Sequence, residues 1–190
     1  PGYEYIVGWV SGSTSYISVI VGSVTFSVYN YSSATLVLSD IALVNYDGDQ
    51  YLDIAAVYAV SDEVVFIEYA NGTFTVLDQE HLSGATPYYI VSGDFTGEGD
   101  PDAIILAMSS DQEDTLLYRF DPSRGLDLLH NFSSKIFQAT PNLPVKPIAM
   151  FDIDRDSRDD VIFGVTDGTY TYIFFYVDIG GSGYYKYYPV

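Results

Sequence analysis

Three short acidic segments recur along this chain, and each is followed directly by a run of apolar residues. The segments begin at Asn45, Asp94 and Asp152, which places them 49 and 58 residues apart. In each segment, side chains that carry oxygen occupy positions 1, 3, 5 and 9, counted from that first residue. Calcium takes roughly six to eight oxygen ligands, and a loop with this spacing can offer several of them to one ion. The sequence therefore predicts up to three sites for Ca²⁺.

The residues after each acidic segment predict a β-strand rather than a helix. Short apolar, β-branched runs begin at Asp53, Asp102 and Asp160, as is typical of buried strands. An EF-hand loop would instead lie between two helices and would end in a bidentate glutamate at position 12. Position 12 is occupied here by residues that cannot bind a cation, namely Ala56, Ile105 and Phe163. The sequence thus excludes an EF-hand.

The spacing of the acidic segments is close to the length of one propeller blade, about 40–50 residues with four strands. We therefore predict an all-β, β-propeller-like fold in a single domain over residues 1–190. It would have about four antiparallel blades of four strands, over approximately residues 1–38, 39–80, 88–132 and 146–190. Three blades would carry a calcium loop between their first and second strands. A β-sandwich is the alternative, but its strands recur about every 8–12 residues without such a longer period. Closure into one ring, or membership of a larger ring, stays open.

Loops of the form D-x-[DN]-x-[DN]-G-x-x-D that open a strand are the signature of FG-GAP repeats, also called VCBS repeats, and the three segments resemble them. This family includes integrin α-subunit propellers and many secreted proteins. The resemblance implies that each loop binds one Ca²⁺ through the side chains at positions 1, 3, 5 and 9 and the carbonyl at position 7. The ligands would be Asn45, Asp47, Asp49, Tyr51 and Asp53 in the first loop, Asp94, Thr96, Glu98, Asp100 and Asp102 in the second, and Asp152, Asp154, Asp156, Arg158 and Asp160 in the third.

Departures from the family pattern bear on how tightly each loop would bind. Gln50 and Ser157 replace the glycine expected at position 6, which implies backbone strain or a different turn there. Asn45 supplies a neutral oxygen, and Thr96 supplies a weak hydroxyl ligand. The third loop has aspartate at all four side-chain positions, so we expect it to be the strongest site.

The charge balance excludes some classes of partner. The chain has 26 carboxylate residues against seven Lys and Arg, for a formal net charge of −19. Without a basic patch to neutralise phosphates, nucleic acid and anionic membrane surfaces are not expected as partners. The apolar stretches are shorter than the roughly 18 residues of a membrane-spanning helix, so no membrane insertion is expected. Cysteine is absent, and bound metal is the plausible stabiliser in place of disulfides.

No catalytic motif of a hydrolase, metalloprotease or nucleotide-binding enzyme is present in the sequence. The two histidines, His81 and His130, share no ligand spacing, and most carboxylates belong to the predicted calcium loops. We therefore expect a protein that is not an enzyme. N-glycosylation sequons at Asn30, Asn71 and Asn131, together with the calcium loops, favour an extracellular glycoprotein, secreted or on the cell surface.

The expected function is adhesion or the building of a surface assembly, with a protein or a glycan as partner. Open sheet edges would also allow self-association between chains. The tyrosine-rich segment 184–188 is either the last strand of the final blade or a strand donated to a neighbour. Two alternatives stay open at this point, a propeller that binds a glycan or another ligand and a propeller-type enzyme.

Overall fold

The computed structural model describes residues 4–12, 14–21, 24–31, 37–49, 51–71, 73–121, 125–132, 143–166, 169–179 and 182–189. These residues form fifteen strands, joined by turns and loops. Within them, no helix has the length and apolar character needed to cross a membrane. The strands are β1 (Glu4–Ser11), β2 (Thr14–Val21), β3 (Val24–Tyr31), β4 (Leu38–Val44), β5 (Asp53–Tyr58), β6 (Glu63–Ala70), β7 (Thr73–His81), β8 (Ala85–Gly93), β9 (Asp102–Ser109), β10 (Thr115–Asp121), β11 (Gly125–Phe132), β12 (Leu143–Phe151), β13 (Asp160–Thr166), β14 (Thr171–Ile179) and β15 (Ser182–Pro189).

The strands form four antiparallel sheets, and each sheet is built from consecutive strands. Sheet 1 has the order β1-β2-β3, sheet 2 β4-β5-β6-β7, sheet 3 β8-β9-β10-β11 and sheet 4 β12-β13-β14-β15. Within each sheet, every strand therefore pairs with the next strand along the chain. Short connections between strands favour this arrangement. The predicted all-β class with antiparallel four-stranded units is confirmed for sheets 2 to 4.

The ends of the predicted units differ slightly from the observed sheets. Sheet 1 has three strands among the described residues, and residues 32–36 lie outside them. Leu38, predicted as the end of the first unit, begins β4 and packs between sheets 1 and 2. β7 continues to His81, β8 begins at Ala85 and β12 begins at Leu143, so these strands extend into the segments left between the predicted units. Residues 133–142 lie outside the described ones.

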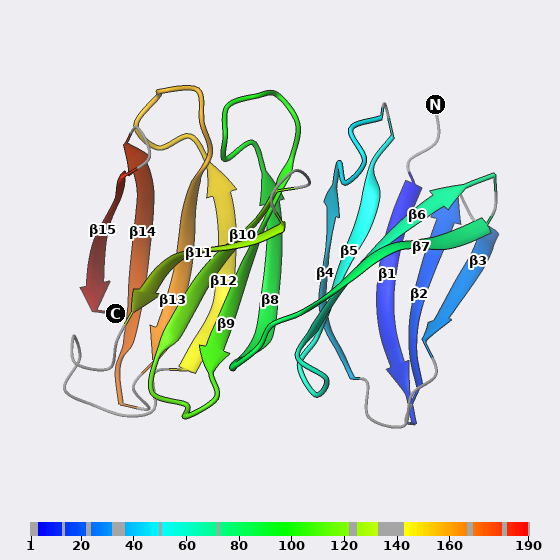
Figure 1. Ribbon diagram of the computed structural model, residues 1–190, viewed down its shortest axis with the longest axis horizontal. Coiled ribbons are helices and arrows are strands. Elements are labelled where there is room, and N and C mark those ends of the chain that lie inside the picture. Colours follow the sequence, from blue (N-terminus) through cyan, green and yellow to red (C-terminus); the bar gives the residue numbers. More distant parts are fainter. Residues whose placement is uncertain are drawn as a thin grey trace.

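The four sheets lie side by side in chain order and form an open row (Figure 1). The first strands of neighbouring sheets contact one another, β1 with β4, β4 with β8, and β8 with β12. Sheet 1 and sheet 4 lie at opposite ends of the row in this view. A closed propeller ring is therefore not found among the described strands.

Apolar side chains between neighbouring sheets form three core clusters, one for each pair of sheets. Ile54 and Ala56 of β5 face sheet 1, whereas Ala55 and Val57 of the same strand face sheet 3. This alternation follows from the two-residue period of a strand, and it explains why β5 and β9, which lie between two neighbouring sheets, are apolar on both faces.

In the three sheets that carry acidic loops, residues at equivalent positions face the equivalent neighbouring sheet. One residue after the aspartate at position 9, Ile54, Ala103 and Val161 all face the preceding sheet. Two residues after that aspartate, Ala55 and Ile104 face the following sheet. The sheets are thus repeats in packing as well as in sequence, and their loops project from equivalent places.

Candidate metal loops

The three acidic loops connect the first and second strands of sheets 2, 3 and 4. Loop 1 is residues 45–52 between β4 and β5, loop 2 is residues 94–101 between β8 and β9, and loop 3 is residues 152–159 between β12 and β13. All three lie along the same edge of the row of sheets, at the top of Figure 1. The loops therefore lie where the sequence places them within each sheet.

Loop 3 brings three carboxylates together. One oxygen from each of Asp152, Asp154 and Asp156 lies within 4.8 Å of the others, and all three side chains are exposed. Backbone N–H groups orient these carboxylates. Ser157 donates to Asp152 Oδ2 at 3.1 Å, Asp156 to Asp154 Oδ1 at 3.2 Å, and Arg158 to Asp156 Oδ1 at 2.9 Å. Three like charges at this separation repel one another, and their oxygen atoms lie close enough to hold one cation.

Loop 1 follows the same hydrogen-bond pattern with an asparagine at its first position. The Asp49 N–H donates to Asp47 Oδ1 at 3.1 Å, and the Tyr51 N–H donates to Asp49 Oδ1 at 2.6 Å, as at the equivalent positions of loop 3. Asn45 Oδ1 accepts from the Gly48 N–H at 3.0 Å, and Asn45 Nδ2 donates to the Asp49 carbonyl at 3.1 Å. Loops 1 and 3 thus share one frame and differ in the charge at position 1.

Loop 2 differs from the other two in its middle. Thr96 at position 3 donates to Asp102 Oδ2 from its N–H at 2.9 Å and from its hydroxyl at 3.1 Å. Asp94 Oδ2 accepts from the Gly99 N–H at 2.9 Å, whereas Asp94 Oδ1 is buried with no hydrogen-bond partner among the described residues. A buried carboxylate oxygen without a partner is costly, so Asp94 fits the role of a cation ligand.

The aspartates at position 9 are the buried members of the loops. Asp53 and Asp160 are each 2% exposed, and Asp102 is 8% exposed. The Tyr46 N–H donates to Asp53 Oδ2 at 3.0 Å, and the Ile153 N–H donates to Asp160 Oδ2 at 2.8 Å. Burial is the main cause that raises the pKa of all three carboxyls, and neighbouring carboxylates of the same loop add to it, while the hydrogen-bond donors act in the opposite direction. A cation beside these carboxylates would favour their ionised form.

The loop backbones turn through left-handed conformations. Residues at position 4 have positive φ in all three loops, namely Gly48, Gly97 and Arg155. At position 6, Gly99 has a φ of 94° and Ser157 a φ of 73°. The strain predicted at Ser157 is therefore confirmed, because a residue with a Cβ is disfavoured there. Gln50 lies outside the described residues.

Hydrogen bonds connect neighbouring loops, which the sequence did not indicate. The Asp94 N–H donates to Asp159 Oδ2 at 2.9 Å, and the Asp159 N–H donates back to the Asp94 carbonyl at 2.8 Å. The Asn45 N–H donates to the Pro101 carbonyl at 3.3 Å. Asp159 precedes a position-9 aspartate, and only the packing of sheet 4 on sheet 3 brings it to loop 2. The three loops thus form one connected edge of the row.

The remaining predicted ligands lie in their loops, and their roles stay predictions. Glu98 and Asp100 are exposed in loop 2. The carbonyls predicted at position 7 belong to Tyr51, Asp100 and Arg158, at the ends of the turns described above.

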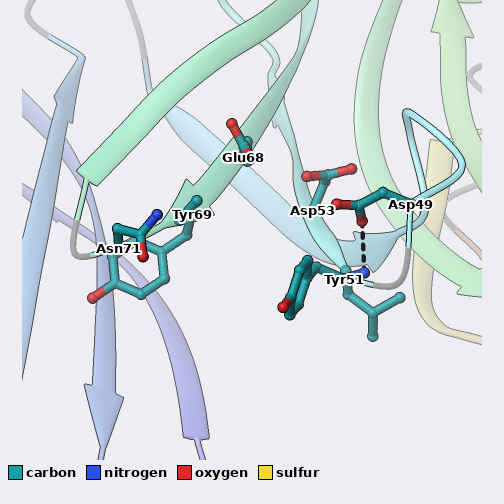
Figure 2. Close-up of a pocket in the computed structure, with 8 residues that line it drawn as sticks. Asp49, Tyr51, Asp53, Glu68, Tyr69 and Asn71 are labelled. Atoms are coloured by element: carbon teal, nitrogen blue, oxygen red, sulfur yellow. Dashed lines mark hydrogen bonds between the residues drawn. The ribbon is translucent and has the colours of Figure 1, made fainter.

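A cleft of about 330 Å³ lies beside loop 1, between it and the end of β6. Figure 2 shows Asp49 and Asp53 close together on one side of this cleft, with Tyr51 below them and Glu68 and Tyr69 across from them. Glu68 was not among the predicted site residues, because a glutamate on a strand carries no loop signal. The cleft combines carboxylates with two tyrosine rings next to the candidate cation site.

Two of the predicted glycosylation sites are exposed. Asn71 lies in the turn between β6 and β7, and Asn131 lies near the end of β11, where its side chain donates to Asp114 Oδ2 at 2.9 Å. The side chain of Asn30 lies outside the described residues, as do Ser32, Gly72 and Ser133. Glycosylation of these sites stays a prediction.

Comparison with known families gives a match inside this region. No curated protein sequence matches the chain. The family model described as an FG-GAP-like repeat matches residues 45–105, a segment that spans loop 1, loop 2 and the strands between them. The predicted resemblance is therefore confirmed over this segment, which is similar to an FG-GAP-like repeat.

Proposed function

We propose that this protein is an extracellular, calcium-stabilised, non-enzymatic module that mediates adhesion or builds a surface assembly. The FG-GAP-like repeat and the four packed antiparallel sheets support a β-propeller-like module of the adhesion type. The sequons at Asn30, Asn71 and Asn131, together with the acidic loops, are the reasons for the extracellular location. The acidic charge disfavours nucleic acid and anionic membranes, which leaves a protein or a glycan as the partner.

The observation that carries the calcium part of the proposal is the carboxylate cluster of loop 3. Its frame of hydrogen bonds recurs in loop 1, and loop 2 contributes a buried oxygen on Asp94 that lacks a partner among the described residues. The donor set consists of oxygen atoms alone, which suits a hard cation such as Ca²⁺. The side-chain ligands would be Asn45, Asp47, Asp49 and Asp53 in loop 1, Asp94, Thr96, Glu98 and Asp102 in loop 2, and Asp152, Asp154, Asp156 and Asp160 in loop 3.

A bound Ca²⁺ would supply the positive charge that these clustered carboxylates require. The residues of the chain act around it. The buried aspartates at position 9 begin the second strand of each sheet and accept hydrogen bonds from N–H groups of their loops. Other backbone N–H groups keep the exposed carboxylates in place. Because Asp159 connects loop 2 to loop 3, order gained in one loop would also stabilise the contact between two sheets.

The test is a pair of thermal melts, in millimolar calcium and in excess chelator, with light scattering on the same samples. We expect a higher melting temperature in calcium, because a ligand that binds only the folded state stabilises it by mass action. The variant Asp154→Ala should lose part of this rise. Glu113→Ala is the matched control, since it removes an exposed carboxylate outside the three loops. Equal melting temperatures of the unaltered protein in calcium and in chelator would contradict the proposal.

A second candidate function, the binding of a glycan or another ligand, is favoured by the cleft beside loop 1. Its carboxylates and its tyrosines could contact hydroxyl groups and the apolar face of a sugar. Binding on a glycan array that is lost in Glu68→Ala would support this candidate, whereas binding that is unchanged in this variant would place the ligand elsewhere.

A further inference from the structure

The row of sheets leaves two outer faces, one on sheet 1 and one on sheet 4, whose equivalents on the other sheets pack against a neighbouring sheet. In sheets 2 and 3, the residues two and four positions after the position-9 aspartate pack against the following sheet. In sheet 4 the equivalent residues are Ile162 and Gly164, which face away from sheet 3. Sheet 1 likewise uses one face of β1 and β2 against sheet 2 and leaves the other face outward.

The outer face of sheet 4 contains an apolar hollow. It has a volume of about 250 Å³ and is lined by Ile153, Phe175, Val177, Lys186 and Tyr188. Tyr188 is 51% exposed, and its ring meets the Phe175 ring edge to face, with the centroids 6.0 Å apart. The inner residues of the same strand, Phe174 and Tyr176, are buried against sheet 3. The hollow thus lies where a following sheet would pack.

The outer face of sheet 1 projects apolar side chains. Tyr5, Val7 and Trp9 alternate along β1 and are 57%, 41% and 43% exposed, while Ile6 between them packs toward sheet 2. The Trp9 ring stacks on Tyr16 with centroids 4.2 Å apart, and its Nε1 donates to Ser18 Oγ at 3.1 Å. These contacts fix the ring in place. An ordered aromatic surface of this kind is typical of a binding face.

We propose that these two faces bind each other between copies of this chain, with sheet 1 of one copy on sheet 4 of the next. The partner is a second copy because sheet 1 of the next copy would follow sheet 4 as each sheet of the molecule follows the one before it. The same kind of face would then pack on the same kind of face. Among the described residues that line the hollow, Lys186 is the one that carries a charge. The contact joins two different surfaces, so it is heterologous and repeats from copy to copy, in an open chain of copies or in a closed ring. This inference rests on the surface-assembly part of the proposed function and identifies its partner.

The experiment uses one variant on each face and sedimentation velocity over a range of concentrations. Val7→Lys alters the sheet 1 face, and Tyr188→Lys alters the sheet 4 face. Val60→Lys is the matched control, since Val60 is 58% exposed in the turn between β5 and β6 of sheet 2, which lies inside the row. We expect the unaltered protein and the control to form species that grow with concentration. Each end-face variant alone should associate at least about tenfold more weakly.

Mixing the two end-face variants provides the decisive measurement. Each variant keeps one intact face, and the two intact faces are complementary, so an equimolar mixture should form 1:1 dimers and no longer species. Association that is lost in Val7→Lys but kept in Tyr188→Lys would indicate a symmetric contact of sheet 1 with itself and would overturn the proposal. A monomer at all concentrations would overturn it as well. Melting temperatures of the same samples check that each variant is folded. They also separate the two ideas, because a calcium-dependent rise in a monomeric protein contradicts the end-face contact alone.

Discussion

Loop 2 and loop 3 begin and end alike, but they stabilise their middle in different ways. In both loops the first aspartate accepts a hydrogen bond from the N–H at position 6, which is Gly99 in loop 2 and Ser157 in loop 3. At position 3, loop 2 has Thr96, whose hydroxyl donates to Asp102. Loop 3 has Asp154 there, which joins two further carboxylates in one cluster.

The two loops therefore stabilise an acidic turn in two different ways. Loop 2 satisfies its buried aspartate with two donors from one threonine and turns through glycine at both positive-φ positions. Loop 3 has four aspartates and turns through Arg155 and Ser157, so it carries more charge repulsion and more backbone strain. We expect loop 3 to depend on a cation and loop 2 to keep its shape largely without one.

The largest expected effect comes from removing the central carboxylate of loop 3. Asp154→Ala should lose about 2.7 kcal/mol of calcium-dependent stabilisation if calcium is present at about 100 times the dissociation constant of that site. For a chain of this size the loss corresponds to roughly 5–10 °C in melting temperature. In chelator the variant should be at least as stable as the unaltered protein, because a repelling charge is gone. Differential scanning calorimetry in both conditions measures the two effects.

Asp154 is a better position for this test than Asp160. Asp160 is buried and accepts from the Ile153 N–H, so its removal would destabilise the fold with or without calcium. The companion variant Thr96→Ala should lose about 1 kcal/mol in both conditions, since it removes a hydrogen bond rather than a charged ligand. A calcium response reduced as much by Thr96→Ala as by Asp154→Ala would break the distinction between the loops.

The second prediction converts loop 2 toward loop 3. Thr96→Asp removes the hydroxyl bond to Asp102 and adds a carboxylate near Asp94, so it should cost roughly 1–2 kcal/mol in chelator. In calcium the new carboxylate should recover this loss and raise the affinity of loop 2. Calcium titration followed by calorimetry measures both. Thr96→Asn is the control of similar shape without the charge, and equal calcium affinities of the two variants would contradict a ligand role for position 3.

The sequence predicts the strands and the loops well because both depend on short-range patterns. The short apolar runs of β5, β9 and β13 are typical of buried strands, and each loop is recognised by the spacing of its oxygen-bearing side chains. The strain at Ser157 follows from a single position in the loop frame. These properties require no knowledge of which sheet lies beside which.

The contacts between repeats could not be predicted in the same way. Asp159 reaches Asp94 across 65 residues, and only the packing of two sheets brings them together. The hydrogen bond from the Thr96 hydroxyl to Asp102 depends on the rotamer of Thr96, which the residue type does not determine. The outward face of β1 reads in the sequence like its inward face, because Trp9 and Ile6 are both apolar residues of one strand. Exposure, which separates them, belongs to the assembled row of sheets.

The smallest expected effect concerns the backbone at position 6, where the residue of each loop can be replaced by that of the other. Ser157→Gly should stabilise the protein by about 0.5–1 kcal/mol, because glycine adopts a φ of 73° without a Cβ penalty. Gly99→Ser should destabilise it by a similar amount. A Cβ built at Gly99 meets no atom within 4 Å, so this variant tests the φ of 94° rather than a steric clash. Thermal or urea unfolding in chelator measures both changes.

Measurements in calcium should separate the effect of the position-6 backbone on stability from the effect of the carboxylate charges. A bound cation acts on the carboxylates, whereas the left-handed φ at position 6 is required in the folded loop with or without it. The opposite shifts of Ser157→Gly and Gly99→Ser should therefore have nearly the same size in calcium and in chelator. If Ser157→Gly were instead stabilising only in chelator, the strain at Ser157 would be relieved by the cation, and loop 3 would change its backbone on binding. The difference between the two loops would then be one of conformation as well as of charge.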